Sequence, residues 1–199
     1  MRSVLTAVIL WASMLGMATA ELSISADNVT LPFSTDPQNG SVEVYVQFTE
    51  GTDLPTLFGP TTYVTLSPAA SGVSFTDFGK TIDHLYVFPT GGQGGPQGSK
   101  SASHIDVTDY DFGGLTLQNN AGLVRIDFQV GGGMTGKFDV LISTDHAKTF
   151  LTDDTGLSIY YDTYNHGSIT IVPEPASLVL ILMGAFTVLC WFNKFRRNA

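Results

Sequence analysis

Apolar and polar residues alternate strictly in four segments in the middle of the chain. The apolar members of these segments are Val42, Val44, Val46 and Phe48; Val124, Ile126, Phe128 and Val130; Phe138, Val140 and Ile142; and Ile169 and Ile171. In the first segment the intervening residues Glu43, Tyr45 and Gln47 are expected on the opposite face. A period of two is typical of strands with one buried and one solvated face. The four segments therefore predict antiparallel sheets packed face to face.

Six further segments show a weaker strand pattern. They are 22–25, 61–66, 81–88, 104–108, 115–118 and 157–161. Gly, Pro, Asn and Asp residues separate the segments, as is typical of turns between short strands. Together the segments predict an all-β fold, an antiparallel jelly-roll-like β-sandwich of about nine strands. The Gly-rich stretch 90–101 is expected to be a surface loop, because it lacks the Gly-Lys-Ser/Thr sequence and the following helix of a phosphate loop.

The first 20 residues have the three parts of a secretory signal peptide. Arg2 provides a positive charge, and residues 4–15 form an apolar core. Ala18 and Ala20 form an A-x-A cleavage site before Glu21. An uncleaved anchor or a buried helix is the alternative. With the signal peptide assigned to 1–20, the remaining region 21–171 is long enough for one domain.

The last 27 or so residues combine a polar motif, an apolar run and a basic end. In chain order they are Pro173, Glu174 and Pro175, the apolar run 178–192, and the basic residues Lys194, Arg196 and Arg197. A helix over 176–195 is long enough to cross a hydrocarbon core of about 30 Å. The positive-inside rule places the basic end in the cytoplasm. Segment 172–199 is therefore predicted to anchor the β-sandwich domain on the outer side of a membrane.

The region between the two end segments is strongly acidic. From Glu21 to Val172 it has five basic and 17 acidic residues, a net charge of about −12. Such a surface repels phosphate backbones, so nucleic acid is not expected as a partner, whereas divalent cations and basic surfaces are attracted. Solubility alone would also account for the charge. The single cysteine, Cys190, lies in the apolar tail, so the domain itself contains no disulfide.

The sequence contains no recognisable catalytic constellation. The four histidines do not have the spacing of a zinc site, and no G-x-S-x-G motif is present. Two aspartate clusters are the candidates for calcium, because loop carboxylates and carbonyl oxygens bind this ion. The clusters are Asp106, Asp109 and Asp111, and Asp153 and Asp154. Turn formation is the alternative role of these aspartates, and no other cofactor is expected.

The C-terminal segment resembles the PEP-CTERM sorting signal of exported bacterial proteins. The resemblance rests on Pro173-Glu174-Pro175, one short hydrophobic helix and a terminal Arg-rich cluster, which follow one another in that order. It implies that an exosortase recognises the motif and processes the chain near it. The protein would then be anchored transiently and end at the cell surface or in the extracellular matrix. A simple membrane anchor is the alternative.

The second half of the middle region is similar to the last strands of cohesin-type domains. The similar segments are 123–130, 135–142, 150–156 and 165–171, of which the last has the sequence Asn-His-Gly-Ser-Ile-Thr-Ile. This resemblance implies a nine-stranded jelly-roll sandwich, and cohesin-type domains bind dockerin partners. The first half of the region matches less well, so the resemblance supports the fold more than dockerin binding.

Taken together, these patterns favour a bacterial cell-surface or extracellular-matrix protein that is not an enzyme. Its expected partners are the secretion machinery, an exosortase, the membrane through the C-terminal helix, and an exopolysaccharide or protein at the cell surface. Two alternatives remain open on the sequence: a secreted carbohydrate-active enzyme, and a calcium-dependent binding module. Both are compatible with a β-sandwich, because a fold does not determine a function.

Overall fold

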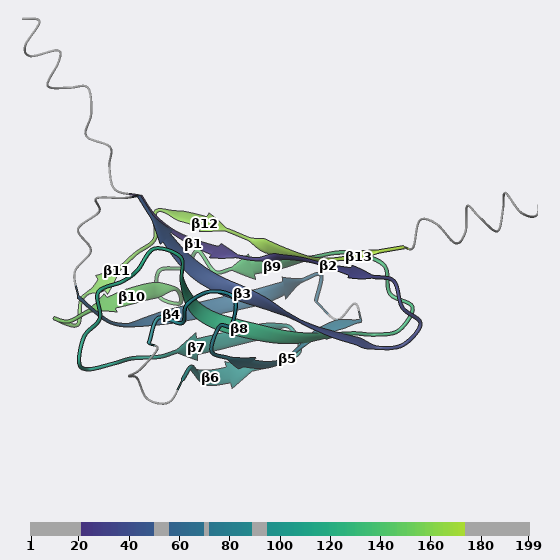
Figure 1. Cartoon of the computed structure of the whole chain (residues 1–199), viewed down its shortest axis with the longest axis horizontal. Coiled ribbons are helices and arrows are strands. Elements are labelled where there is room, and N and C mark those ends of the chain that lie inside the picture. Colours follow the sequence, from purple (N-terminus) through teal and green to yellow (C-terminus); the bar gives the residue numbers. More distant parts are fainter. Residues whose placement is uncertain (1–20, 50–55, 70–71, 89–94, 174–199) are drawn as a thin grey trace, which may run out of the picture.

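The described part of the protein is an all-β sandwich of two sheets (Figure 1). The computed structural model describes residues 21–49, 56–69, 72–88 and 95–173. These ranges contain thirteen strands and no helix, so the all-β prediction is confirmed and the predicted strand number was too low. No helix within them is long and apolar enough to span a membrane. The predicted signal peptide and C-terminal helix lie outside the described residues.

One sheet has five strands. In spatial order they are β12 (Thr163–Asn165), β1 (Leu22–Ala26), β3 (Gln38–Phe48), β8 (Ala121–Val130) and β5 (Val73–Gly79). The long strands β3 and β8 form its centre, with Val42 opposite Ile126 and Val44 opposite Val124. A bulge between Val44 and Tyr45 shifts the register by one residue, so that Tyr45 lies opposite Gly122.

The other sheet has eight strands around the long strand β4. Its main path is β11 (Ser158–Ile159), β10 (Phe150–Asp153), β4 (Leu57–Ser67), β9 (Gly136–Ile142), β13 (Gly167–Val172) and β2 (Asn28–Pro32). β7 (His104–Thr108) pairs with β4 and with β6 (Gln97–Lys100). The sequence assigns residues 90–101 to a loop, but 97–100 form β6. Gly98 permits the pairing with β7, because a Cβ there would lie 1.9 Å from the Asp106 carbonyl oxygen.

The alternating apolar positions form the core between the sheets, as predicted. Val42, Val44, Val46, Val124, Ile126, Phe128, Val140 and Ile169 are all fully buried. Burial of each such side chain contributes about 1.5–3 kcal/mol before the entropy of ordering is subtracted. The four strongly alternating segments therefore correspond to β3, β8, β9 and β13.

The prediction of a strand over 81–88 was wrong. In this segment only Tyr86 makes a bridge, an isolated parallel one to Gly122. The amides of Ile82, Asp83 and His84 donate to the carboxylate of Glu43 and not to a neighbouring strand. The predicted strand over 115–118 is likewise reduced to one bridge between Leu57 and Leu115, and that over 157–161 to the two residues of β11.

The sheets are not purely antiparallel, contrary to the prediction. β1 runs parallel to β12, and β2 runs parallel to β13. The first described segment crosses from one sheet to the other at Asp27, and the last crosses beside it at His166. Gly167 permits this crossing, because a Cβ there would lie 2.3 Å from the Asp27 carbonyl oxygen. The two ends of the described chain are therefore held together along both sheets.

Candidate binding face

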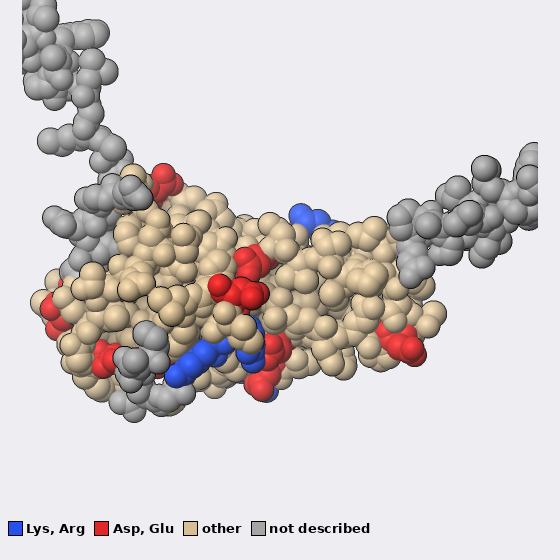
Figure 2. Space-filling view, in the orientation of Figure 1, with Lys and Arg blue, Asp and Glu red and all other residues tan. Residues whose placement is uncertain are grey.

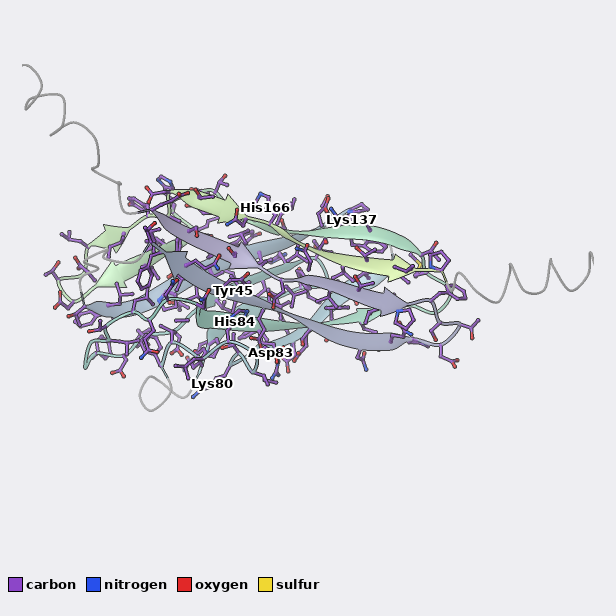
Figure 3. The ribbon with its side chains drawn as sticks, turned by 45° about the horizontal axis from the view of Figure 1, so that its top comes forward. Tyr45, Lys80, Asp83, His84, Lys137 and His166 are labelled. Atoms are coloured by element: carbon purple, nitrogen blue, oxygen red, sulfur yellow. The ribbon has the colours of Figure 1, made fainter. Side chains whose placement is uncertain are left out.

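The outer face of the five-stranded sheet is partly covered by residues 82–84. Glu43 points outward from β3 as predicted, but it is only 3% exposed, because residues 82–84 lie over it. The ring of His84 stacks on that of Tyr45 at a centroid distance of 3.9 Å (Figure 3), and its Nε2 lies 3.6 Å from Asp27. This covering and desolvation, followed by the charge of Asp27, raise the pKa of Tyr45.

Charged side chains on this side of the molecule gather in a band across its middle, and most of the remaining surface is uncharged (Figure 2). Ion pairs account for part of the charge on this sheet. Arg125 donates to both carboxylate oxygens of Asp127 at 2.9 and 3.1 Å, and Lys100 Nζ lies 2.7 Å from Asp77. The hydrogen bond from Lys100 is the main cause that lowers the pKa of Asp77.

The outer face of the eight-stranded sheet presents a different set of side chains. The register between β4 and β7 places Thr61 opposite Thr108, Tyr63 opposite Asp106, and Thr65 opposite His104. Their neighbours Thr62, Val64, Ile105 and Val107 point into the core. This alternation leaves a row of hydroxyl, aromatic and charged groups on the outside. We refer to it as the β4–β7 face.

Tyr63 is the centre of the β4–β7 face. The His104 ring is nearly parallel to the Tyr63 ring at a centroid distance of 5.8 Å, and Lys148 Nζ lies 4.8 Å from the centre of the same ring. His104 is fixed by Ser101, whose hydroxyl lies 2.6 Å from Nδ1 and accepts the His104 amide at 3.1 Å. Lys148 follows a turn in which its amide donates to the Asp145 carbonyl at 2.9 Å.

A buried polar pair lies beneath the extension of β7. The Tyr86 hydroxyl donates to Asp109, which is 2% exposed, and the other Asp109 oxygen accepts the Tyr110 amide at 2.8 Å. Burial, and then the hydrogen bond and charge of Asp109, strongly raise the pKa of Tyr86. Asp109, a calcium candidate from the sequence, is therefore directed into the core toward Tyr86.

The other calcium candidates lie apart, in different settings. Asp106 is exposed on β7, and Asp111 accepts the Gly113 amide at 2.8 Å. Asp153 accepts the Thr155 hydroxyl at 2.7 Å and the amides of Thr155 and Leu157, which lowers its pKa. Asp154 is exposed in the same turn. Over the described residues, no three His, Cys, Asp or Glu side chains converge as a group that could hold a metal ion.

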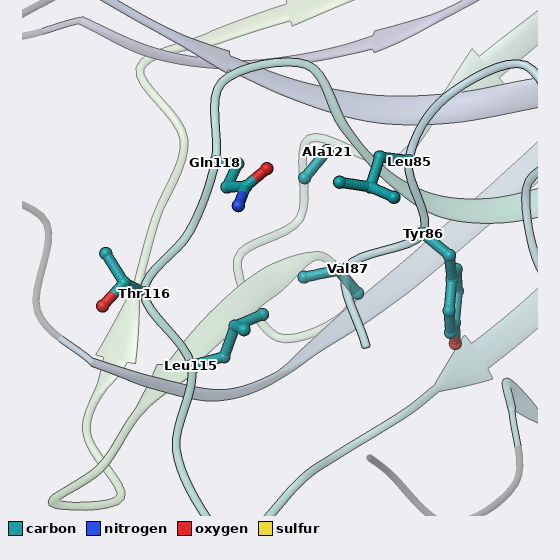
Figure 4. A pocket seen from close by; sticks show the side chains of 7 residues that line it. All are labelled: Leu85, Tyr86, Val87, Leu115, Thr116, Gln118 and Ala121. Atoms are coloured by element: carbon teal, nitrogen blue, oxygen red, sulfur yellow. The ribbon is translucent and has the colours of Figure 1, made fainter. Parts of the chain in front are cut away.

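Three hollows in the described surface contain few ionisable side chains. One, near Leu85, Tyr86 and Gln118, has a volume of about 30 Å³, enough for about one water molecule (Figure 4). The other two have volumes of about 380 and 230 Å³ and contain only Glu21 and only Asp109, respectively, as an ionisable acid. None of the three contains a histidine.

The residues assigned to export and sorting fall at the edges of the described ranges. Glu21 and Pro173 are described, and both are exposed. Ala18, Ala20, Glu174, Pro175, Lys194, Arg196 and Arg197 lie outside the described residues. Their assigned roles stay predictions.

Sequence reasoning missed the cluster around Tyr63. Its members come from positions 63, 104 and 148, and only the pairing of β4 with β7 and the turn at Asp145 bring them together. The alternation in 61–66 and 104–108 was the available signal, because it places Tyr63 and His104 on the outward side of their strands.

The chain matches no known protein family and no curated protein sequence. Its fold is similar to solved cohesin structures. The seventh ScaB type I cohesin of Pseudobacteroides cellulosolvens has a TM-score of 0.56 at 11% identity, over 79% of this chain and 96% of the cohesin. A chain of the CaDoc0917–CaCohA2 complex, of which CaCohA2 comes from Clostridium acetobutylicum, gives 0.56 at 15% identity, over 76% and 99%. A chain of a type I cohesin–dockerin complex from Clostridium thermocellum gives 0.54 at 11% identity, over 76% and 99%. At these identities the likeness establishes a cohesin-like β-sandwich fold.

Proposed function

We propose that the protein is a non-enzymatic binding module of the bacterial cell surface, which recognises a protein partner through the β4–β7 face. The observation that carries the proposal is the cluster of Tyr63, His104 and Lys148 on an otherwise hydroxyl-rich strand surface. Aromatic residues at the centre of a patch, surrounded by polar groups, are typical of protein interfaces.

The geometry of the face supports recognition and not catalysis. The His104 ring is held by the Ser101 hydroxyl, and the backbone of Lys148 is held by the Asp145 turn. This order lowers the entropy that is lost when a partner binds. Two of the three solved structures described above are complexes, and one of them is named as a cohesin with a dockerin. By analogy, a protein partner fits this fold better than a small-molecule substrate.

Export and sorting complete the proposal. The signal peptide over 1–20 would direct secretion, and the Pro173-Glu174-Pro175 motif would present the chain to an exosortase once its apolar tail is in the membrane. Pro173 is exposed at the end of β13, where a membrane-embedded peptidase would have access to it.

Photo-crosslinking in the organism's own cells tests the binding face. A photoreactive phenylalanine analogue at Tyr63 is expected to capture one predominant protein, whereas the same analogue at Gln129, exposed on the five-stranded sheet, is expected not to. Equal unfolding midpoints of the two substituted chains and the natural chain will establish that both are folded. Identical products from both positions, or none from Tyr63, would contradict the proposal.

Mass spectrometry of the protein isolated from the same cells tests sorting separately. Processing by an exosortase predicts a mature C-terminus close to Pro173. A mature chain that still ends at Ala199 would refute processing and leave a permanent anchor. A Glu174→Ala variant that is cut as efficiently as the natural chain would show that the motif is not recognised.

A further inference from the structure

Three aromatic rings meet at one end of the eight-stranded sheet. The ring of Phe112 lies 5.1 Å from that of Tyr110 and 6.0 Å from that of Phe58, measured between centroids. Phe112 is 70% exposed, so its ring adds little to the core. Single exposed apolar residues are common, but a group of aromatic rings beside a hollow is typical of a ligand site.

The hollow beside these rings has a volume of about 230 Å³. Besides the three aromatic residues it is lined by Gly59, Thr108, Asp109 and Thr152. Gly59 is required here, because a Cβ at this position would lie 1.9 Å from the Asp109 carbonyl oxygen. The absence of a side chain lets the segment after β7 run close to β4, which brings Tyr110 and Phe112 next to Phe58.

A short turn holds the rings in place. The Asp111 amide donates to the Phe58 carbonyl at 2.7 Å, and the Gly114 amide donates to the Asp111 carbonyl at 3.1 Å. Gly114 has a φ of 72°, a left-handed conformation that favours glycine. The aromatic group is thus already arranged before any ligand arrives, which lowers the entropic cost of binding.

The chemistry of the lining selects the class of ligand. It offers aromatic faces and the hydroxyls of Thr108 and Thr152, of which that of Thr108 already donates to the Pro60 carbonyl at 3.1 Å. The carboxylate of its one acid, Asp109, is bonded to Tyr86 and Tyr110. A sugar ring matches this combination, because its C–H face packs on an aromatic ring while its hydroxyl groups bond to polar neighbours. The net charge of about −12 repels acidic polymers. We propose that this hollow binds a sugar unit of a neutral polysaccharide.

This glycan site and the proposed protein interface share Thr108, but their central residues are different. The key residue of the glycan site, Phe112, belongs to the turn after β7, whereas the protein interface centres on Tyr63 within β4. Variants of the two residues therefore separate the proposals: loss of one kind of binding with the other intact shows which of them fails.

Native gel electrophoresis in the presence of polysaccharide tests the site. The full chain, in a detergent without a sugar headgroup, is run through gels that contain neutral β-glucan, xylan, mannan or galactan, with acidic alginate for comparison. We expect at least one neutral polymer to retard the protein and alginate not to. Phe112→Ala is expected to lower the affinity about tenfold, and Phe112→Tyr to retain it.

Leu157→Ala is the matched control, since Leu157 is also exposed, at 67%, and does not line the hollow. Equal unfolding midpoints of the Phe112 variants and the natural chain will establish that they are folded. The proposal is overturned if none of the four neutral polymers retards the protein, if alginate alone does, or if Phe112→Ala and Leu157→Ala have the same effect. Inhibition of the retardation by an apolar peptide but not by free oligosaccharide would assign the hollow to a peptide.

Discussion

The outer faces of the two sheets differ in how much of their polar surface is covered. On the five-stranded sheet residues 82–84 cover part of the face, and the buried carboxylate of Glu43 holds them there. The eight-stranded sheet leaves Tyr63 and its neighbours on the surface, fixed by contacts from the side. The difference is that one face uses a buried polar group to hold a covering segment, whereas the other leaves its polar groups accessible.

Removal of the Glu43 carboxylate is expected to have the largest effect on stability. Glu43→Ala leaves the amides of Ile82, Asp83 and His84 without their acceptor and exposes the sheet beneath them. Hydrogen bonds to a charged group contribute about 1.5–3 kcal/mol each, and part is recovered from water, so we expect a loss of about 3 kcal/mol. Urea unfolding, followed by far-UV circular dichroism, measures this loss in the free energy of unfolding.

Gln47→Ala is the matched control for Glu43. Gln47 lies on the same face of β3 and bonds to the side chains of Ser25 and Asn120, but it holds no backbone amide. An equal loss of stability in the two variants would show that the bonds from Glu43 to the amides of residues 82–84 have no special role.

The Tyr86→Phe variant tests the buried pair of Tyr86 and Asp109. It removes the hydroxyl that donates to the buried Asp109 and leaves that oxygen without a partner. We expect a loss of about 2 kcal/mol in the free energy of unfolding. Tyr161→Phe is the comparison, because the buried Tyr161 hydroxyl has no hydrogen-bond partner in the described part of the chain. A loss in Tyr161→Phe as large as in Tyr86→Phe would contradict this account.

Alkaline pH should lower the stability of the protein. The pKa values of Tyr86 and Tyr161 are raised in the folded state, mainly by burial, so these groups stay protonated while the unfolded chain ionises near pH 10. Their contribution is fully present below pH 10 and is lost above it, by about 1.4 kcal/mol per pH unit for each tyrosine. Unfolding curves between pH 8 and 12 check the slope. Each Tyr→Phe variant should make the slope shallower, and an unchanged slope would refute its assignment.

Substitution of Tyr63 should have the smallest effect on stability. The Tyr63→Ser variant removes a ring from the β4–β7 face and leaves the core residues Thr62 and Val64 in place. We expect a change within about 0.5 kcal/mol, as is usual for surface positions. A loss comparable to that of Glu43→Ala, in the same urea experiment, would mean that the two faces do not differ in the way described.

The sequence predicted the strands in which side chains alternate, but it also predicted a strand where a long-range contact prevents one. β3, β8, β9 and β13 follow from a period of two, because each buries one face. Segment 81–88 has enough β-formers to suggest a strand, but Glu43, about 40 residues earlier, takes its amides. No local pattern contains that information.

Long-range contacts also determine the positions of Asp109 and of the Tyr63 cluster, which the sequence did not predict. Asp109 lies in a loop-like cluster of acids in the sequence, yet its hydrogen bond to Tyr86 turns it inward. Tyr63 and His104 meet only through the pairing of β4 with β7, and Lys148 joins them through the turn at Asp145. Outward orientation was therefore predictable for Tyr63 and His104, whereas the grouping of side chains was not.

The end of β13 and the aromatic hollow lie at opposite ends of the molecule, which determines how a tethered protein would present the hollow. β13 ends at one end of the elongated molecule, and β10 and β11 lie at the other (Figure 1). The aromatic hollow belongs to that second end, since Thr152 of β10 forms part of its lining. A protein tethered through the residues after Pro173 would hold this hollow away from the membrane, at the tip that first meets whatever surrounds the cell.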